Sequence, residues 1–246
     1  MTIKGLIGGT LAALTLGACA TAETPAKPAP VELNTYILLD RTGSMSDIWD
    51  EALTSVNAYA DSVVEPDDGP EVINDLTFAV FDHQQGFQFD ILRDNVSGED
   101  WTSISPDEVS PRGTTPLFDA IGQIIALAEE DNPEKAIIVI MTDGHENASQ
   151  ELGKKEVKAA IERAEARGWQ VVFLGAEFAN FADADAVGVT SSKQMAVSKD
   201  QLAPSMDNLA KKSRSYAQET EEGVEFNADD RALADEEDVK QRKGGN

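Results

Sequence analysis

The sequence alternates between short apolar runs and longer segments that carry apolar residues at helical spacing. A continuous apolar run is typical of a strand covered on both faces of a sheet, because such a strand has no polar side. Four runs of this kind predict strands at 33–39, 76–81, 136–141 and 169–174. Apolar residues spaced three to four positions apart predict helices at 48–64, 116–130, 151–167 and 202–218.

Three further segments complete the expected order. Phe87, Phe89 and Ile91 alternate with other residues, so the stretch 86–92 is expected to form a hairpin with the strand before it. A short helix is expected within 178–188, and an edge strand at 194–197. Alternation of strands and helices predicts an α/β fold: a Rossmann-like, doubly wound, mostly parallel central sheet with helices on both faces.

The N-terminus has the features of an export signal. Lys4 provides a positive charge, and the apolar run at 6–16 is too short to span a membrane. The run ends in small residues followed by Cys19, the only cysteine of the chain, which resembles a bacterial lipobox. Residues 1–18 are therefore expected to be a lipoprotein signal peptide, with Cys19 as the lipidation site. Acyl chains on this cysteine would anchor the protein to a membrane.

An ordinary secretory signal, cleaved near Ala18 or Ala22, is the alternative to lipidation. Either signal implies export. Ala20 follows the cysteine where enterobacterial lipoproteins retained in the inner membrane carry aspartate. By that resemblance we expect a location in the bacterial cell envelope, with the outer membrane favoured, on its periplasmic or surface face.

Composition divides the remainder of the chain. The Pro/Ala-rich segment 19–32 predicts an extended tether, and 33–218 predicts one domain. Residues 219–246 are acidic and glycine-terminated, and we expect a disordered tail there.

The chain has 45 acidic and 20 basic residues and a net charge of -25. This charge would repel phosphate backbones, so nucleic acid is not an expected partner.

Oxygen-bearing side chains stand at three separate places just after predicted strands or at a helix start. They are the segment 40–44 (Asp-Arg-Thr-Gly-Ser), the segment 113–116 (Gly-Thr-Thr-Pro) and the pair 143–144 (Asp-Gly). Oxygen-only ligands suit a hard divalent cation such as Mg²⁺. Taken singly, each has an ordinary structural explanation, since such residues also cap helices and form turns. Thr115 before Pro116, for example, could be a helix N-cap.

Together these fragments resemble the metal-ion-dependent adhesion site of von Willebrand factor type A (VWA) domains, with its pattern Asp-x-Ser-x-Ser, Thr, Asp. The resemblance covers about 34–218, and Thr42 stands where the pattern has serine. Thr115 is preferred over its neighbour Thr114 because Thr115-Pro116-Leu117 sets the register. The resemblance implies metal ligands at Asp40, Thr42, Ser44, Thr115 and Asp143.

The resemblance also implies a function. Two carboxylates and three hydroxyls leave a six-coordinate Mg²⁺ short of a ligand, which in family members comes from an acidic side chain of a protein partner. We therefore expect a binding module rather than an enzyme, with Mg²⁺, or Mn²⁺ or Ca²⁺ as alternatives. Two other hypotheses stay open: a metal-dependent hydrolase that uses His145 and Glu146, and a scaffold whose metal site is structural or vacant.

Overall fold

The computed structural model describes residues 1–2, 28–178 and 180–243. Cys19, the expected signal peptide after its first two residues, and the expected tether up to position 27 lie outside the described residues. Within the described part, no helix has both the length and the apolar character needed to cross a bilayer.

A six-stranded sheet forms the centre of the domain, in the order β3-β2-β1-β4-β5-β6. Its strands are β1 (Val31–Asp40), β2 (Val72–His83), β3 (Phe87–Ser97), β4 (Ala136–Thr142), β5 (Gln170–Ala176) and β6 (Gln194–Val197). Neighbouring strands are parallel except β2 and β3, which form the expected antiparallel hairpin. The predicted fold class is confirmed.

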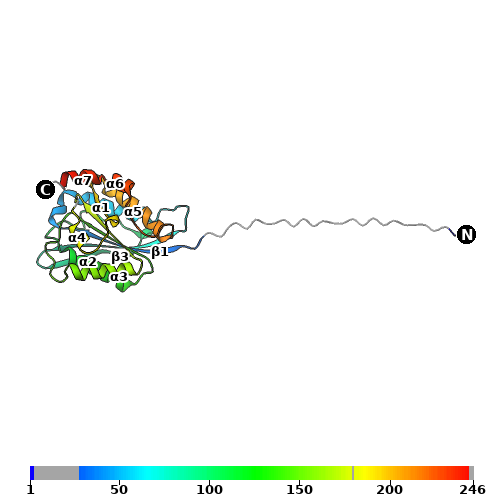
Figure 1. Cartoon of the computed structure of the whole chain (residues 1–246), viewed down its shortest axis with the longest axis horizontal. Coiled ribbons are helices and arrows are strands. Elements are labelled where there is room, and N and C mark those ends of the chain that lie inside the picture. Colours follow the sequence, from blue (N-terminus) through cyan, green and yellow to red (C-terminus); the bar gives the residue numbers. More distant parts are fainter. Residues whose placement is uncertain (3–27, 179, 244–246) are drawn as a thin grey trace.

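Helices cover both faces of this sheet (Figure 1). They are α1 (Trp49–Val63), α2 (Leu117–Asp131), α3 (Lys154–Ala166), α4 (Ala182–Ala186), α5 (Leu202–Ala217), α6 (Ala228–Leu233) and α7 (Glu236–Lys243). Helices α1 and α5 pack on one face, and α2 and α3 on the other. A 3₁₀ turn, Gly43–Ile48, joins β1 to α1.

Strand β1 shows why both faces are covered. Ile37 and Leu39 belong to the core beneath α1 and α5, whereas Tyr36 and Leu38 belong to the core beneath α2 and α3. Successive side chains of a strand point to opposite faces, so a continuous apolar run needs a helix layer on each side. Each fully buried side chain of this size contributes about 1.5–3 kcal/mol, which holds the sheet between its two layers.

The C-terminal segment is folded up to residue 243, so the expectation of a disordered tail is wrong. Val224, Phe226, Ala234 and Val239 are buried, and α6 and α7 flank the last strand, β6. The backbone N–H of Ser198 donates to the carbonyl of Ala234 at 2.9 Å. Charged residues outnumber these widely spaced apolar residues. The average composition of the segment therefore does not reveal that a few apolar side chains pack it against the domain.

Glu236 explains how so acidic a segment can pack against the sheet. Its carboxylate accepts a hydrogen bond from the backbone N–H of Ala196 in β6, at 3.1 Å. It also pairs with Arg231 and Lys240, both at 2.8 Å. The carboxylate thus satisfies an edge N–H that would otherwise be open to another strand, while two cations compensate its burial.

Candidate functional site

The predicted site residues meet at the carboxyl ends of β1 and β4. These two strands are neighbours in the sheet although they are far apart in the chain. Asp40 is the last residue of β1, and Asp143 directly follows β4. The chain leaves β1 toward β2 on one side and reaches β4 on the other, so strand order reverses here. Ligands of open α/β sheets bind at such a switch point.

A chain of hydrogen bonds joins the five predicted residues. The Thr115 hydroxyl donates to the Thr42 hydroxyl at 3.3 Å, and the hydroxyls of Thr42 and Ser44 lie 3.1 Å apart. Ser44 donates to Asp143 Oδ1 at 2.7 Å. The backbone N–H of Thr42 donates to Asp40 Oδ1 at 2.7 Å. All five predicted residues are therefore brought together in one place.

The set has a buried inner side and an exposed outer side. Asp40, Thr42 and Thr115 are buried, whereas Asp143 is half-buried and Ser44 is exposed. Burial raises the pKa of Asp40 to about 7; hydrogen bonds from Thr142 and Thr42 lower it in part, and the charge of Asp143 raises it further. Two carboxylates at this short range disfavour each other's ionised form, and a cation between them would favour it.

The oxygen spacing fits a small hard cation. Mg²⁺ binds oxygen at 2.0–2.1 Å in an octahedron, so neighbouring ligand oxygens lie about 2.9 Å apart. The three oxygen pairs that run from Thr115 through Thr42 and Ser44 to Asp143 measure 3.3, 3.1 and 2.7 Å. In the described residues, no group of three or more His, Cys, Asp or Glu could hold a metal. The predicted set differs from such a group because it combines two carboxylates with three hydroxyls.

The threonine loop is held against the first loop by backbone contacts. The N–H of Gly43 donates to the carbonyl of Gly113 at 3.2 Å. The N–H of Arg112 donates to the carbonyl of Arg41 at 2.7 Å. Gly113 has φ +72, and a Cβ there would lie 2.6 Å from the carbonyl oxygen of His83. Only glycine fits this approach without strain.

The two adjacent threonines have different roles. Thr114 is exposed, and its backbone exchanges hydrogen bonds with His83 at 2.9 and 3.2 Å. Thr115 is buried and joins the hydroxyl chain through Thr42. The geometry thus supports the choice of Thr115, which sequence register alone had suggested.

Helix capping does not explain these hydroxyls. Thr42 precedes the 3₁₀ turn without a side-chain capping bond, and α2 begins at Leu117 after Pro116, so the expectation that Thr115 caps this helix is wrong. Glu146 does the capping instead, from the loop after β4. Its Oε2 accepts the N–H of Phe118 at 2.9 Å.

Glu146 also holds its own loop. Its Oε1 accepts the backbone N–H groups of Ala148 and Ser149, at 2.9 and 2.7 Å. The Ser149 hydroxyl donates to Oε2 at 2.6 Å. A carboxylate with this many donors at a helix N-terminus stabilises the fold. This structural role leaves it poorly suited to act as the catalytic base of a hydrolase.

The two histidines lie in separate environments. His145 Nδ1 is 3.1 Å from Asp183 Oδ2, and its ring packs edge-on against Phe178. His83 Nε2 is 3.1 Å from the side-chain amide nitrogen of Gln150. The structure therefore does not bring the histidines into one metal-binding pair.

An ion cluster behind the site, with Arg41 and Asp82 buried and Arg112 and Asp90 partly exposed, was not predicted from the sequence. Asp82, at the end of β2, lies 3.2 Å from Arg41 and 2.5 Å from Arg112. Arg41 also reaches Asp90 of β3 at 2.5 Å. The sequence did hold one signal for this cluster, because Arg41 lies between Asp40 and Thr42, and Arg112 directly precedes the 113–116 segment. The cluster ties two of the loops that carry predicted site residues to the β2–β3 hairpin.

The family model of the von Willebrand factor type A domain matches residues 34–219, which is more than half of the chain. The chain belongs to the VWA domain family. No curated protein matches its sequence at a significant level.

Solved structures show the same VWA fold at low sequence identity. The pili tip protein Mfa5 of Porphyromonas gingivalis has a vWF domain that is 10% identical, with a TM-score of 0.57 over 76% of this chain and 97% of that one. A manganese-loaded TRAP protein of Plasmodium vivax is 18% identical, with a TM-score of 0.51 over 70% of this chain and 71% of that one.

Proximal thread matrix protein 1 from the mussel byssus is 16% identical to the VWA chain, with a TM-score of 0.53 over 74% of this chain. The match spans 46% of the mussel protein, so this chain corresponds to less than half of that relative. At these identities the three likenesses show the fold alone.

A cavity of about 480 Å³ adjoins the predicted site of this VWA domain. Ser44 and Asp143 line it on one side. The loops after β5 and β6 and the C-terminal helix α7 supply further lining residues, which include Glu177, Lys199, Asp200, Asp235, Asp238 and Arg242. Two of the predicted site residues therefore share this cavity with residues of the C-terminal segment.

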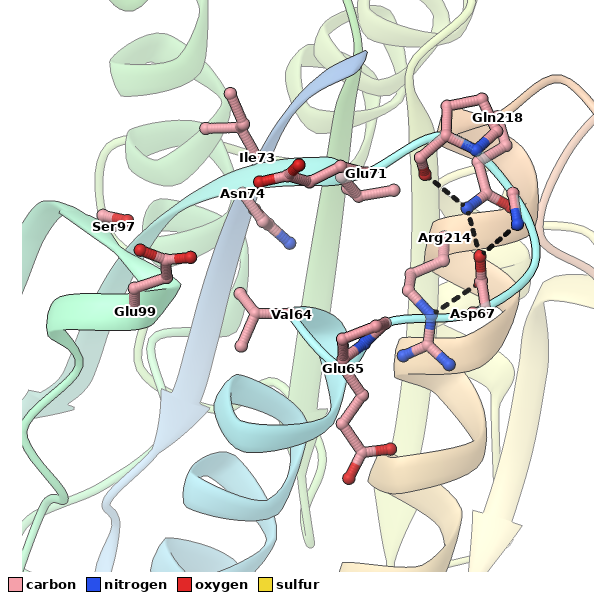
Figure 2. Close-up of a pocket in the computed structure, with 14 residues that line it drawn as sticks. Val64, Glu65, Asp67, Glu71, Ile73, Asn74, Ser97, Glu99, Arg214 and Gln218 are labelled. Carbon is pink, nitrogen blue, oxygen red and sulfur yellow. Dashed lines mark hydrogen bonds and ion pairs between the residues drawn. The ribbon is translucent and has the colours of Figure 1, made fainter. Parts of the chain in front are cut away.

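A second cavity, of about 470 Å³, is lined by none of the five predicted residues (Figure 2). Its lining includes the apolar side chains of Val64 and Ile73 and the acidic residues Glu65, Glu71 and Glu99. Asp67 closes one side through hydrogen bonds with Arg214 and Gln218, at 3.2 and 2.9 Å. This cavity belongs to the ends of α1 and α5 and not to the predicted metal site.

Proposed function

We propose that this VWA domain holds a divalent cation through Asp40, Thr42, Ser44, Thr115 and Asp143 and uses it to bind an acidic group of a protein partner. The hydrogen-bonded chain of side-chain oxygens carries this proposal, because it brings hydroxyls and a carboxylate from three separate loops together. Binding, rather than catalysis, is the proposed activity.

Mg²⁺ is the proposed cation. The hydroxyls would act as neutral ligands, and Asp40 and Asp143 would supply two negative charges, directly or through water. Mn²⁺ resembles Mg²⁺ in its preference for oxygen ligands, and the TRAP relative was solved with manganese. Ca²⁺ binds oxygen at 2.3–2.6 Å, which requires wider spacing between neighbouring ligands, so it ranks third.

The remaining coordination position is proposed to face the cavity. Asp40 lies on the buried side, whereas Ser44 and Asp143 line the cavity. A partner carboxylate arriving from the cavity would complete the coordination shell and neutralise the cation further. This arrangement supports recognition of acidic groups despite the net charge of -25.

The proposed setting is the bacterial cell envelope. Export through the signal at 1–18 and lipidation at Cys19 would tether the domain, with the outer membrane favoured. The vWF domain relative from a pili tip protein supports a role outside the cytoplasm. Fractionation of cells that express Cys19→Ser tests the anchor: the variant should leave the membrane fraction.

Calorimetric titration of Mg²⁺ and Mn²⁺ into the chain without its signal tests the metal site. We expect one site in the wild type and loss of binding in Asp40→Ala. Asp107→Ala is the matched control, because Asp107 is exposed on a loop away from the site. No binding in the wild type, or equal binding in Asp40→Ala, would refute the proposal.

A partner pull-down from envelope extracts separates the binding module from an inert scaffold. Capture should require Mg²⁺ and should be lost in Asp40→Ala. If chelation of the metal leaves the captured protein unchanged, the cation does not take part in recognition and the scaffold hypothesis is preferred.

A further inference from the structure

Glu177 occupies an unusual position beside the candidate metal site. It directly follows β5, the strand next to β4, and it lines the same cavity as Ser44 and Asp143. Its backbone has φ +54, in the left-handed region that is uncommon for residues other than glycine. Such conformations concentrate at ligand clamps, where surrounding contacts enforce them. Here the N–H of Glu177 donates to the carbonyl of Val197 at 2.8 Å.

The Glu177 carboxylate forms an ion pair with the guanidinium group of Arg242. Arg242 Nη1 donates to Oε2 at 2.8 Å, and Nη2 donates to Oε1 at 3.3 Å. Two parallel bonds from one guanidinium to one carboxylate form a specific, directional pair. The Glu177 side chain is 12% exposed and that of Arg242 is 45% exposed. Both side chains line the cavity, and the backbone N–H of Lys199 also donates to Glu177 Oε1, at 2.8 Å.

Arg242 lies in the last turn of α7, beyond Glu236 and Val239, the two side chains of this helix that are buried. Val239 is the apolar side chain that α7 buries, and the rest of this helix is charged or polar by sequence. Arg242 also pairs with Asp238 of the same helix at 2.7 Å. Since Arg242 is the exposed partner of the pair, at 45%, and lies near the end of α7, another cation can replace it on Glu177 without disturbing the core.

The cavity is acidic once Arg242 has left. Its carboxylates come from the loops after β1, β4, β5 and β6 and from the C-terminal segment: Asp47, Asp143, Glu177, Asp200, Asp235 and Asp238. Lys199 is the other basic residue that lines it. A partner carboxylate moving toward the cation would meet this negative wall, and a cation next to that carboxylate would remove the repulsion.

We infer that Glu177 is a second recognition point of this domain, which takes a guanidinium or ammonium group that the partner carries beside its metal-binding carboxylate. In the free protein Arg242 fills this position as an internal competitor. The inference rests on the proposed function for the carboxylate end of the partner. It goes further because it predicts that the partner carries a basic group beside its acidic group.

Peptide binding in saturating Mg²⁺ tests this inference on the full chain without its signal. The probes are acetylated, amidated peptides with one glutamate and one arginine, separated by zero to four glycines. Matched peptides carry citrulline, which keeps the shape of arginine without its charge. Arg242→Gln should bind at least one arginine peptide about tenfold more tightly than the wild type does, because the competitor is gone.

Three comparisons make the result specific. The citrulline peptides should bind Arg242→Gln and wild type equally, and Glu177→Gln added to Arg242→Gln should abolish the preference for arginine. Arg163→Gln is the matched control, since it removes a similar exposed ion pair, with Glu129, on another face. Mg²⁺ affinity should be the same in all these variants.

The outcomes separate this inference from the proposed function. If Mg²⁺ binds and the peptides bind, but arginine and citrulline peptides are equal in Arg242→Gln, the role of Glu177 is refuted and the metal site stands. If arginine peptides bind the double variant as tightly as Arg242→Gln, the role of Glu177 is again refuted. If neither Mg²⁺ nor Mn²⁺ binds the wild type, the proposed function itself fails.

Discussion

Replacement of Glu146 by alanine distinguishes a structural carboxylate from a catalytic one. Glu146 lies only three residues after Asp143, so it is the residue that a hydrolase would use as a base. In the structure it caps α2 through the N–H of Phe118 and holds the N–H groups of Ala148 and Ser149. Glu146→Ala would leave these three donors without their acceptor.

The expected loss of stability follows from these bonds. A hydrogen bond to a charged group contributes about 1.5–3 kcal/mol net, and loss of a helix N-cap costs about 1 kcal/mol. Glu146 is half-buried, so water can reach part of the loop after the substitution. We therefore expect a total loss of about 2–4 kcal/mol, which in a domain of this size lowers Tm by roughly 5–15 °C.

Thermal unfolding followed by circular dichroism measures this effect, with Glu162→Ala as the control because Glu162 is an exposed glutamate of α3. The control should unfold within about 2 °C of the wild type. A Glu146→Ala protein as stable as the control would refute the capping argument. Metal-dependent turnover of phosphoester or peptide substrates that disappears in a fully folded Glu146→Ala protein would establish the hydrolase instead.

Three further substitutions test other parts of the molecule. Gly113→Ala should lower Tm by several degrees and weaken Mg²⁺ binding, because a Cβ would meet the His83 carbonyl oxygen at 2.6 Å in a left-handed conformation; unchanged calorimetry and Tm would contradict this. Thr42→Val should weaken Mg²⁺ binding about tenfold or more while Thr42→Ser retains it, since a ligating hydroxyl is lost only in valine; equal affinities would show that Thr42 is not a ligand. Phe226→Ala should destabilise the domain by about 3 kcal/mol in urea unfolding, because the side chain is buried; a change below 0.5 kcal/mol would indicate that the C-terminal segment does not pack as described.

Sequence patterns located the strand ends well but not the contacts between loops. Asp40 and Asp143 could be placed at one sheet edge because each follows a continuous apolar run, and parallel strands share their carboxyl edge. The same reasoning could not find Glu146 as the cap of α2, since its partner Phe118 lies in the first turn of that helix, far from Glu146 in the sequence. Composition also misled at the C-terminus, where Phe226 packs into the core although its neighbours are mostly charged or polar.

By itself, the sequence determined the order of strands and helices up to α5, the mostly parallel sheet and the candidate set of oxygen ligands. These features depend on local spacing: the period of apolar residues, and the residue types that directly follow a buried strand. Only the tertiary structure decided that Thr115 rather than Thr114 joins the hydroxyl chain, and that Arg242 pairs with Glu177 in the cavity beside it. Those facts depend on distances between residues far apart in the chain, which packing sets and local sequence does not record.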